Sequence, residues 1–407
     1  MECRFCNKPL TNLFLSLGSF PLSNSFLTRE QLYQREVFYP LEVYVCNSCF
    51  LVQLQEYETP ENIFGDYSYF SSYSDTWLKH AKKYSEDMVR LFRFDRNSFV
   101  VEIASNDGYL LQYFAERGIP VLGIEPARNV AEVARNKGIP TEGIFFGSET
   151  AKQLASKGKH ADLLLGNNVL AHVPSLNDFV KGLKILLKPR GVITMEFPHL
   201  MRMMEETQFD TIYHEHFSYF SFLTVERIFH SHGLTLFDVE ELSTHGGSLR
   251  IYARHTEDTT KPITERVGQL KQKEMNAGYT DIHHYLGFQE KVEGIKKDIL
   301  KFLIQTKEEG KRVVGYGAPA KGNTLLNYCG IRTDFIDYTV DRNPYKQGHF
   351  LPGSHIPIEA PNKFKETKPD YVLILPWNLK DEVMEQMAFI RQWGGKFVVP
   401  IPKILVI

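Results

Sequence analysis

Two Cys-x-x-Cys pairs lie within the first fifty residues, and they constrain the fold of this chain more than any other feature. The pairs are Cys3/Cys6 and Cys46/Cys49, and they use four of the five cysteines in the sequence. Each pair can place two thiolates on one tight knuckle, and two knuckles supply the four sulfur ligands of a tetrahedral zinc ion. Because four thiolates leave no open coordination position, we expect the zinc to be structural. Residues 1–65 are therefore predicted to form a zinc-binding module; the alternatives are two redox-active pairs or four incidental cysteines.

Composition sets the limits for the rest of the chain. Its 407 residues are enough for two or three domains. A formal net charge of −2 argues against a protein whose whole surface binds nucleic acid. No apolar run is long enough to cross a membrane, and no basic and then apolar leader precedes the first knuckle. Reduced thiolates fit a reducing cytosol, so we expect a cytoplasmic protein. We also expect a monomer or a small homo-oligomer.

Short apolar segments alternate with helical patterns after the zinc module. The first predicted strands span 98–104, 120–124, 161–165 and 192–197. This alternation indicates a parallel, doubly wound α/β sheet. A charged helical stretch then leads to a second α/β pattern that begins near residue 312. The predicted order is a zinc module (1–65), an α/β domain (66–255), a helical crossover (256–310) and a second α/β domain (311–407).

The turn after the first predicted strand is suited to close approach of a ligand. Ala104, Asn106 and Gly108 stand where small residues are wanted, but only Gly108 keeps a glycine of the dinucleotide-binding motif. This favours a ligand without phosphates. Glu125 ends the next strand, where its carboxylate can accept hydrogen bonds from two ribose hydroxyls. Acidic groups here, Glu102 among them, would also attract a sulfonium cation, which predicts S-adenosylmethionine as the cofactor; the alternative is a sheet without a ligand.

Further polar side chains are expected at the same crevice. Asn167 and Asn168 end the fourth strand with their amides facing it, and His172 follows in the next loop. The hydroxyl-rich stretch 65–74 has neither helical nor strand periodicity, which is typical of a loop or lid over a site. We assign Tyr69 of this stretch to the cofactor site, together with the two asparagines. The alternatives are a surface-packed connector for 65–74 and a structural role for His172.

The densest cluster of ionisable residues spans 210–220. Its histidines do not follow the His-Glu-x-x-His spacing of zinc proteases. In an extended segment, His214 and His216 share one face and Glu215 lies on the other. A histidine of near-neutral pKa could abstract a proton there, with a carboxylate and a phenol to orient it. The alternative is a hydrogen-bonded surface loop.

The last domain carries a glycine-rich turn at 315–324, between a strand and a helix. Lys321 in this turn fits an anion cradle, although no Ser or Thr follows it as in a P-loop. Asn323 belongs to the same segment. Asp341, after the next strand, could contact a sugar or a nucleotide. Packing at a second sheet edge is the alternative for these residues.

Taken together, these motifs resemble the S-adenosylmethionine-dependent sugar C-methyltransferases of deoxysugar pathways. The resemblance covers essentially the whole chain. It implies an N-terminal zinc-binding domain, a central methyltransferase domain and a C-terminal Rossmann-like domain. Ala104 departs from the family pattern, which commonly has glycine at that position. The most specific points are the paired cysteines and the segments 102–111, 213–219 and 315–323.

Members of that family methylate C3 of a nucleotide-linked 4-keto-6-deoxyhexose. The 4-ketone acidifies the C3 proton, a base removes it, and the enolate carbon attacks the sulfonium methyl group. By resemblance, His216 matches the position of the base. The same resemblance implies that Tyr213, Glu215 and His172 surround the reacting centre and that the substrate is a nucleotide sugar.

Two other classes of protein are compatible with parts of the sequence. An NAD-dependent sugar-nucleotide oxidoreductase would use the turn that contains Lys321, but neither α/β pattern has an intact G-x-G-x-x-G motif. A zinc adaptor or a zinc-containing RNA-modifying protein would explain the cysteines. An RNA-modifying protein would need a basic stripe, and none is evident in this sequence.

Overall fold

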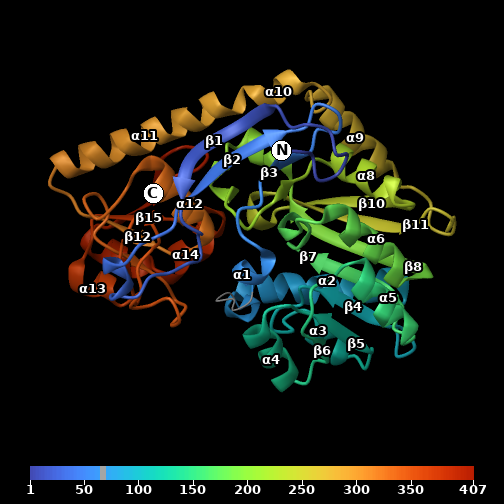
Figure 1. Ribbon diagram of the computed structural model, residues 1–407. Helices are drawn as coiled ribbons and strands as arrows, with labels where there is room; N and C mark the ends of the chain where they lie inside the picture. Colours follow the sequence, from blue (N-terminus) through green and yellow to red (C-terminus); the bar gives the residue numbers. More distant parts are fainter. Residues whose placement is uncertain (65–69) are drawn as a thin grey trace.

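Three β-sheets organise the molecule, and the computed structural model describes residues 1–64 and 70–407 (Figure 1). The first sheet belongs to the N-terminal module, the second to the central domain and the third to the C-terminal domain. The predicted α/β class, with a Rossmann-like sheet in each of the two larger domains, is confirmed. Across the described ranges, no helix combines the length and the apolarity needed to cross a bilayer.

The N-terminal sheet is antiparallel and takes its last strand from another part of the chain. Gln53 pairs with Ser218 and Val52 with Tyr219, so the segment with the predicted catalytic histidines ends in this sheet. A short helix, α1 (Pro60–Phe64), follows the first three strands. In spatial order the strands are β1 (Asn12–Phe20), β2 (Tyr39–Val45), β3 (Val52–Leu54) and β9 (Ser218–Tyr219).

The central sheet has seven strands in the order β10-β11-β8-β7-β4-β5-β6. Its core is parallel and agrees with the predicted strands, whereas the sequence did not predict the antiparallel edge of β10 and β11. The parallel strands are β4 (Val100–Ile103), β5 (Val121–Ile124), β6 (Thr141–Glu142), β7 (Ala161–Asn167) and β8 (Leu187–Pro198). The edge strands are β10 (Leu234–Leu242) and β11 (Ser248–His255).

Helices surround the central sheet and bury one apolar face against it. In α2 (Asp75–Phe92), for example, the Ser74 hydroxyl caps the first turn by accepting the Trp77 N–H at 3.3 Å, and Ala81, Tyr84 and Met88 are buried at helical spacing. The other helices are α3 (Leu111–Ala115), α4 (Arg128–Asn136), α5 (Ser148–Ser156), α6 (Leu176–Leu186), α7 (Leu200–Glu205) and α8 (Phe222–Ser231).

The predicted crossover consists of three helices, and the longest of them covers the N-terminal sheet (Figure 1). In this helix, α11, the apolar residues Phe288, Val292 and Ile299 are buried, and the Phe288 ring stacks on Phe14 of β1 at 4.9 Å between centroids. The crossover is therefore packed on one face. Its high charge had suggested a solvated helix that only connects the two domains. Its helices are α9 (Glu265–Asn276), α10 (Ile282–Leu286) and α11 (Phe288–Glu308).

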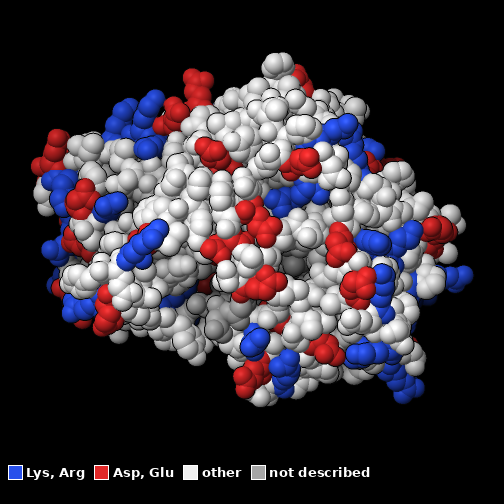
Figure 2. Space-filling view, in the orientation of Figure 1, with Lys and Arg blue, Asp and Glu red and all other residues white. Residues whose placement is uncertain are grey.

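The C-terminal sheet is parallel except at its last strand, and its order is β14-β13-β12-β15-β16-β17. Its strands are β12 (Val313–Tyr316), β13 (Thr339–Val340), β14 (Ile358–Glu359), β15 (Tyr371–Ile374), β16 (Lys396–Val399) and β17 (Leu405–Val406). The helices of this domain are α12 (Ala320–Cys329), α13 (Lys363–Thr367) and α14 (Lys380–Gln386). On the face seen in Figure 2, basic and acidic side chains are interspersed.

Candidate functional site

A cavity of about 690 Å³ is lined by residues from all three parts of the chain. The central domain contributes the carboxyl ends of β4, β5 and β7, and the C-terminal domain contributes the turn before α12. This agrees with the general position of ligands in open α/β sheets. The predicted site residues on its wall are Ala104, Asn106, Glu125, Asn167, Asn168, His172, Tyr213, His216 and Lys321.

The turn after β4 holds Glu125 in a fixed position. The backbone N–H of Asn106 donates to Glu125 Oε2 at 2.9 Å, and the N–H of Ala127 donates to Oε1 at 2.9 Å. Burial raises the pKa of Glu125 above its ordinary value. A carboxylate can accept about four hydrogen bonds, so both oxygens can still accept from a ligand hydroxyl. Ala104, with φ 54°, takes the left-handed conformation that glycine would adopt without strain.

Glu102 and Gly108 support this turn from behind and are not among the residues of the described chain that line the cavity. Glu102 is buried in β4, and burial, together with the nearby Glu125 and Asp107, raises its pKa well above the ordinary value. Gly108 has φ 76°, and a Cβ there would lie 3.0 Å from Ile139 Cγ1. Glycine is thus explained by the left-handed turn and by close packing of the chain.

The two asparagines at the end of β7 have different partners. Both polar atoms of the Asn167 side chain are buried and have no hydrogen-bond partner among the described residues. Asn168 Nδ2 contacts His245 Nε2 at 2.8 Å. Asn167 is therefore available to bind a ligand, since an unpaired buried amide costs free energy. Tyr69, which we assigned to the same site, lies outside the described residues.

His216 is held as a neutral imidazole whose second nitrogen faces Tyr213. Its Nδ1 donates to the carbonyl oxygen of Thr211 at 2.8 Å, which leaves the lone pair on Nε2. That lone pair accepts the Tyr213 hydroxyl at 2.9 Å. Burial, with the neighbouring histidines and Lys321, lowers the pKa of His216 well below its ordinary value. The neutral ring can accept a proton at Nε2 once the Tyr213 hydroxyl turns away from that nitrogen.

The expectation that His214 and His216 share one face is wrong. The N–H of His216 donates to the Tyr213 carbonyl at 2.9 Å, so the segment turns where an extended strand was assumed. His214 consequently points to the N-terminal sheet, where its Nε2 lies 3.2 Å from the carbonyl oxygen of Pro40. A turn places residues three apart together, which explains the contact between Tyr213 and His216.

His172 and Glu215 flank the same centre in different ways. The rings of His172 and His216 are 4.6 Å apart between centroids and meet edge to face at 72°. Burial lowers the pKa of His172 to about 4, so it is neutral at physiological pH. Glu215 does not line the cavity as the described residues define it, but its Oε1 accepts from Asn24 Nδ2 at 2.6 Å, and Asn24 does.

The three residues expected in the C-terminal domain are placed differently. Lys321 lines the cavity, donates from Nζ to Asn378 Oδ1 at 2.9 Å and lies 4.7 Å from the ring centroid of Trp377. Asn323 is buried and donates from Nδ2 to the carbonyl oxygen of Ser23 at 2.6 Å. Asp341 Oδ2 accepts the N–H of Ala318 at 2.8 Å. Of the three, only Lys321 is on the described cavity wall.

The sequence reasoning missed His245 and Lys346 on the cavity wall. Lys346 Nζ donates to the carbonyl oxygen of Ala318 at 2.9 Å, beside the turn that carries Lys321. His245 precedes two glycines, Gly246 and Gly247, and this His-Gly-Gly triplet after a strand was the available signal. Isolated loop residues otherwise carry no periodicity that would reveal them.

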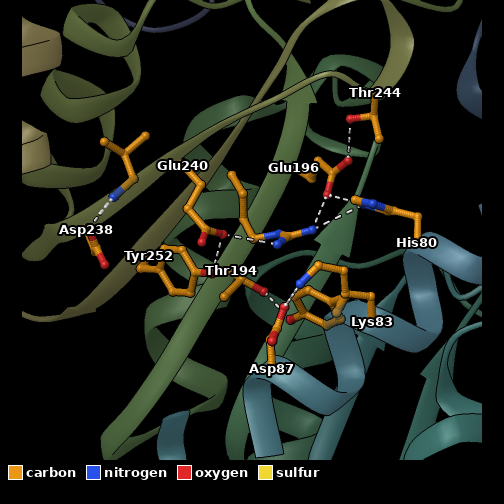
Figure 3. Close-up of polar contacts among 12 residues, drawn as sticks. His80, Lys83, Asp87, Thr194, Glu196, Asp238, Glu240, Thr244 and Tyr252 are labelled. Atoms are coloured by element: carbon orange, nitrogen blue, oxygen red, sulfur yellow. Dashed lines mark hydrogen bonds and ion pairs between the residues drawn. The ribbon is translucent and has the colours of Figure 1, made fainter. Parts of the chain in front are cut away.

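A buried ionic network includes Thr244, the residue that precedes His245 in the sequence (Figure 3). Glu196, on β8, is fully buried and accepts hydrogen bonds from His80 Nε2 at 2.9 Å, Arg250 at 2.8 Å and Thr244 Oγ1 at 2.8 Å. Burial alone would raise its pKa, but the His80 hydrogen bond and the Arg250 charge lower the pKa of Glu196 to about 2. The carboxylate is thus charged and fully engaged, and it fixes the loop that follows β10.

The four N-terminal cysteines form a site that fits zinc. Their sulfur atoms all lie within 4.8 Å of one another, and Cys3 and Cys49 are 3.5 Å apart. Zinc–sulfur bonds of about 2.3 Å in a tetrahedron imply sulfur separations of about 3.8 Å. Gln53 Nε2 donates to the Cys3 sulfur at 3.2 Å, as expected for a ligand that is a thiolate.

Comparison with known families divides the chain into three matches. Residues 3–64 match a zinc binding domain, residues 77–239 a methyltransferase domain, and residues 243–402 the C-methyltransferase C-terminal domain. The C-methyltransferase NovU of Streptomyces niveus is 35% identical over 402 residues, which are 99% of this chain and 96% of NovU.

More distant similarities cover less than half of the chain. A ubiquinone biosynthesis O-methyltransferase of Bartonella tribocorum is 30% identical over 116 residues, 28% of this chain and 47% of that protein. Among solved structures, the magnesium protoporphyrin IX methyltransferase of Synechocystis PCC 6803 with bound SAM has 15% identity and a TM-score of 0.34. That match covers 47% of this chain and 88% of the other.

Proposed function

Because the chain belongs to the family of S-adenosylmethionine-dependent C-methyltransferases that includes NovU, we propose that it methylates C3 of a nucleotide-linked 4-keto-6-deoxy sugar. The observation that carries this proposal is the neutral His216 in a cavity that is lined by both an acidic and a basic side chain. The cavity is lined by the Glu125 carboxylate of the central domain and by the Lys321 ammonium of the C-terminal domain. A base between a cation-binding end and an anion-binding end is what base-assisted methylation of a nucleotide sugar requires.

The carboxylate end of the cavity suits the cofactor. When bound, S-adenosylmethionine supplies an electrophilic methyl group on a positively charged sulfur. Glu125 accepts hydrogen bonds from the ribose hydroxyls, and the unpaired amide of Asn167 binds nearby. Phe145 and Phe146 add apolar surface to the same wall. The carboxylates around the turn also favour a cation over a phosphate.

The lysine end suits the substrate. Lys321 and Lys346 both line the cavity, and each has donors left for a diphosphate after its one hydrogen bond to the protein. Asn323 and Asp341 would act on this end indirectly, because they hold the chain around the turn. The nucleotide sugar then directs its ketone ring toward His216.

The proton at C3 is removed by His216. Its Nε2 takes the proton while the electron pair of the C3–H bond moves into the enolate, whose carbon then attacks the methyl group. The Thr211 carbonyl stabilises the imidazolium that forms, because it accepts from Nδ1 throughout. Tyr213 and His172 orient the ring, and Glu215 holds Asn24, which lines the same cavity. The four zinc thiolates support a cytoplasmic location for the reaction.

The proposal is tested by methyl transfer from labelled S-adenosylmethionine to a panel of nucleotide 4-keto-6-deoxy sugars. Each is matched with the sugar in which the ketone is reduced to an alcohol. We expect transfer only to the ketones, with the label on C3 in the NMR spectrum of the product. A label on an oxygen atom, or equal transfer to the alcohols, would count against the proposed substrate and mechanism.

A further inference from the structure

A third imidazole, that of His245, lines the cavity and has no role in the steps described above. It lies in a short 3-10 turn, Thr244–Gly246, and its backbone has φ 54° and ψ 21°. Left-handed backbone at a non-glycine residue costs free energy and persists only where the surroundings hold it. Such positions cluster at functional sites.

The turn that carries His245 is fastened at each end. Thr244 donates its hydroxyl to the buried Glu196 at 2.8 Å, so the network of Figure 3 fixes the residue before His245. Gln208 Nε2 donates to the carbonyl oxygen of Gly246 at 2.7 Å, and a Cβ on Gly246 would lie 2.6 Å from Trp377. These contacts keep the ring of His245 in one place on the cavity wall.

One nitrogen of His245 is used and the other is available. Asn168 Nδ2 donates to His245 Nε2 at 2.8 Å, so the proton of the neutral ring is on Nδ1. Within the described part of the chain, no residue forms a hydrogen bond to that Nδ1. The Trp77 ring flanks the imidazole at 5.1 Å between centroids. Burial lowers the pKa of His245 to about 4, so the ring stays neutral at physiological pH.

We propose that His245 is a catalytic residue whose Nδ1–H donates a hydrogen bond to the C4 oxygen of the sugar, an inference that rests on the proposed function. His216 takes the C3 proton, the C3–H electron pair forms the C3–C4 double bond, and the carbonyl electron pair moves onto the C4 oxygen. When C3 attacks the methyl group, the C4 carbonyl re-forms and the electron pair of the sulfur–methyl bond stays on sulfur. His245 keeps its proton throughout.

A preorganised neutral donor suits this position. The hydrogen bond strengthens as negative charge develops on the oxygen, so it stabilises the transition state more than the ground state. Other donors that line the cavity include Lys321, which donates to Asn378 and which we assign to the diphosphate, and Tyr213, whose hydroxyl donates to His216. Loss of one such donor typically lowers kcat by about 10² to 10³.

The test compares His245→Gly with the parent enzyme. Glycine adopts the left-handed conformation without strain, so the fold should be kept. We expect kcat and the rate of C3 proton exchange with deuterated water to fall together by about 10² to 10³, as for loss of an oxyanion donor. The affinity for S-adenosylmethionine should stay within twofold, roughly 0.4 kcal/mol. Added imidazole should restore part of the exchange rate.

Two controls separate this role from a structural one. Lys368→Gly relieves another left-handed residue, with φ 46°, outside the cavity, and it should leave kcat unchanged. Nitrogen-15 NMR of ring-labelled histidine should show an Nδ1–H tautomer for the signal that is missing from His245→Gly. An Nε2–H tautomer there would overturn the proposal.

The failure of this inference and that of the proposed function are distinguishable. If the parent methylates C3 and His245→Gly exchanges the C3 proton at the parent rate, His245 is only a turn residue. If the variant loses cofactor affinity by the same factor as kcat, His245 binds the cofactor and the inference fails. A parent enzyme that exchanges no C3 proton in any 4-keto sugar would refute the proposed function, and this inference with it.

Discussion

The central and C-terminal sheets use the same device to shape the turn after their first strand. In each, a carboxylate from the end of the second strand accepts a backbone N–H of that turn. Glu125 accepts from Asn106 at 2.9 Å, and Asp341 accepts from Ala318 at 2.8 Å. The two domains thus share a way of building a rigid crevice at the carboxyl ends of parallel strands.

The two sheets differ in the side chains that they contribute to the cavity wall. Glu125 lines the cavity itself, whereas at the other sheet the lining residues are Lys321 and Lys346, and Asp341 stays behind the turn. The comparison teaches that this fold fixes the position of a crevice and leaves its charge to a few side chains. In the function that we propose, the carboxylate serves a cationic cofactor and the two ammonium groups serve an anionic substrate in the same cavity.

Loss of the zinc should have the largest effect and should spare both of these sheets. Structural zinc sites bind with about 10 kcal/mol or more, so Cys46→Ser should unfold the N-terminal module. Because β9 of that sheet follows His216, methyl transfer should be lost while the Rossmann-like domains stay folded. Metal analysis, circular dichroism and thermal unfolding would measure this, with Cys329→Ser as the control. A fully stable, active Cys46→Ser protein would contradict the prediction.

Replacement of the base should lower the rate of the reaction without changing the affinity for either ligand. We expect His216→Asn to lower turnover by about 10² to 10⁴, the usual contribution of a positioned base. Calorimetric affinities for both ligands should remain, while C3 proton exchange and methyl transfer fall together. His214→Asn is the matched control and should keep its turnover per folded molecule. Exchange at the parent rate in His216→Asn would assign the base to another residue, with His172 next.

The carboxylate end is tested by Glu125→Ala. Loss of hydrogen bonds to a charged group should weaken S-adenosylmethionine binding by about 1.5 to 3 kcal/mol. Affinity for the nucleotide sugar should not change, because Lys321 and Lys346 are intact. Glu125→Gln keeps one acceptor oxygen and should lose less. Unchanged calorimetric affinity for the cofactor in Glu125→Ala would remove this residue from the site.

Replacement of Lys321 should have a smaller effect than replacement of Glu125, and it should weaken binding of the substrate where Glu125→Ala weakens binding of the cofactor. Lys321→Met keeps an apolar stem over the Trp377 ring but removes the charge, so nucleotide-sugar affinity should fall about tenfold, or roughly 1.4 kcal/mol. Cofactor affinity should be unchanged. Asp341→Asn keeps an acceptor for Ala318 and should alter substrate affinity less than Lys321→Met does. The reverse order would mean that Asp341 contacts the substrate and that the two sheets are more alike than we describe.

The sequence was informative wherever a function depends on spacing within one short segment. The two cysteine knuckles were predicted in this way, and their four sulfur atoms lie together in the structure. Residues at strand ends, such as Glu125 and Asn167, were predicted in the same way, and they line one cavity. His214 was misjudged because a period of two holds only in extended chain, and the segment turns. A hydrogen bond from the His216 N–H to the Tyr213 carbonyl oxygen belongs to that turn.

Residues whose role depends on pairing between distant strands could not be predicted. His245 reaches the cavity because β11 pairs with β8, with Ser248 opposite Pro198, which brings the preceding turn close to Glu196. The antiparallel edge strands were not predicted from the sequence, so neither this turn nor its ionic anchor was expected. Tertiary context supplied both.

The short strand β9 has a consequence for how such enzymes can be recombined. An exchange of residues 1–64 between two relatives would transplant three strands of the N-terminal sheet and leave the fourth with the recipient. The new seam would run between Gln53 and Ser218, beside the histidine that we assign as the base. Productive hybrids should therefore carry residues 209–220 along with the donor's first domain. The base and the zinc-binding cysteines should then come from the same parent protein.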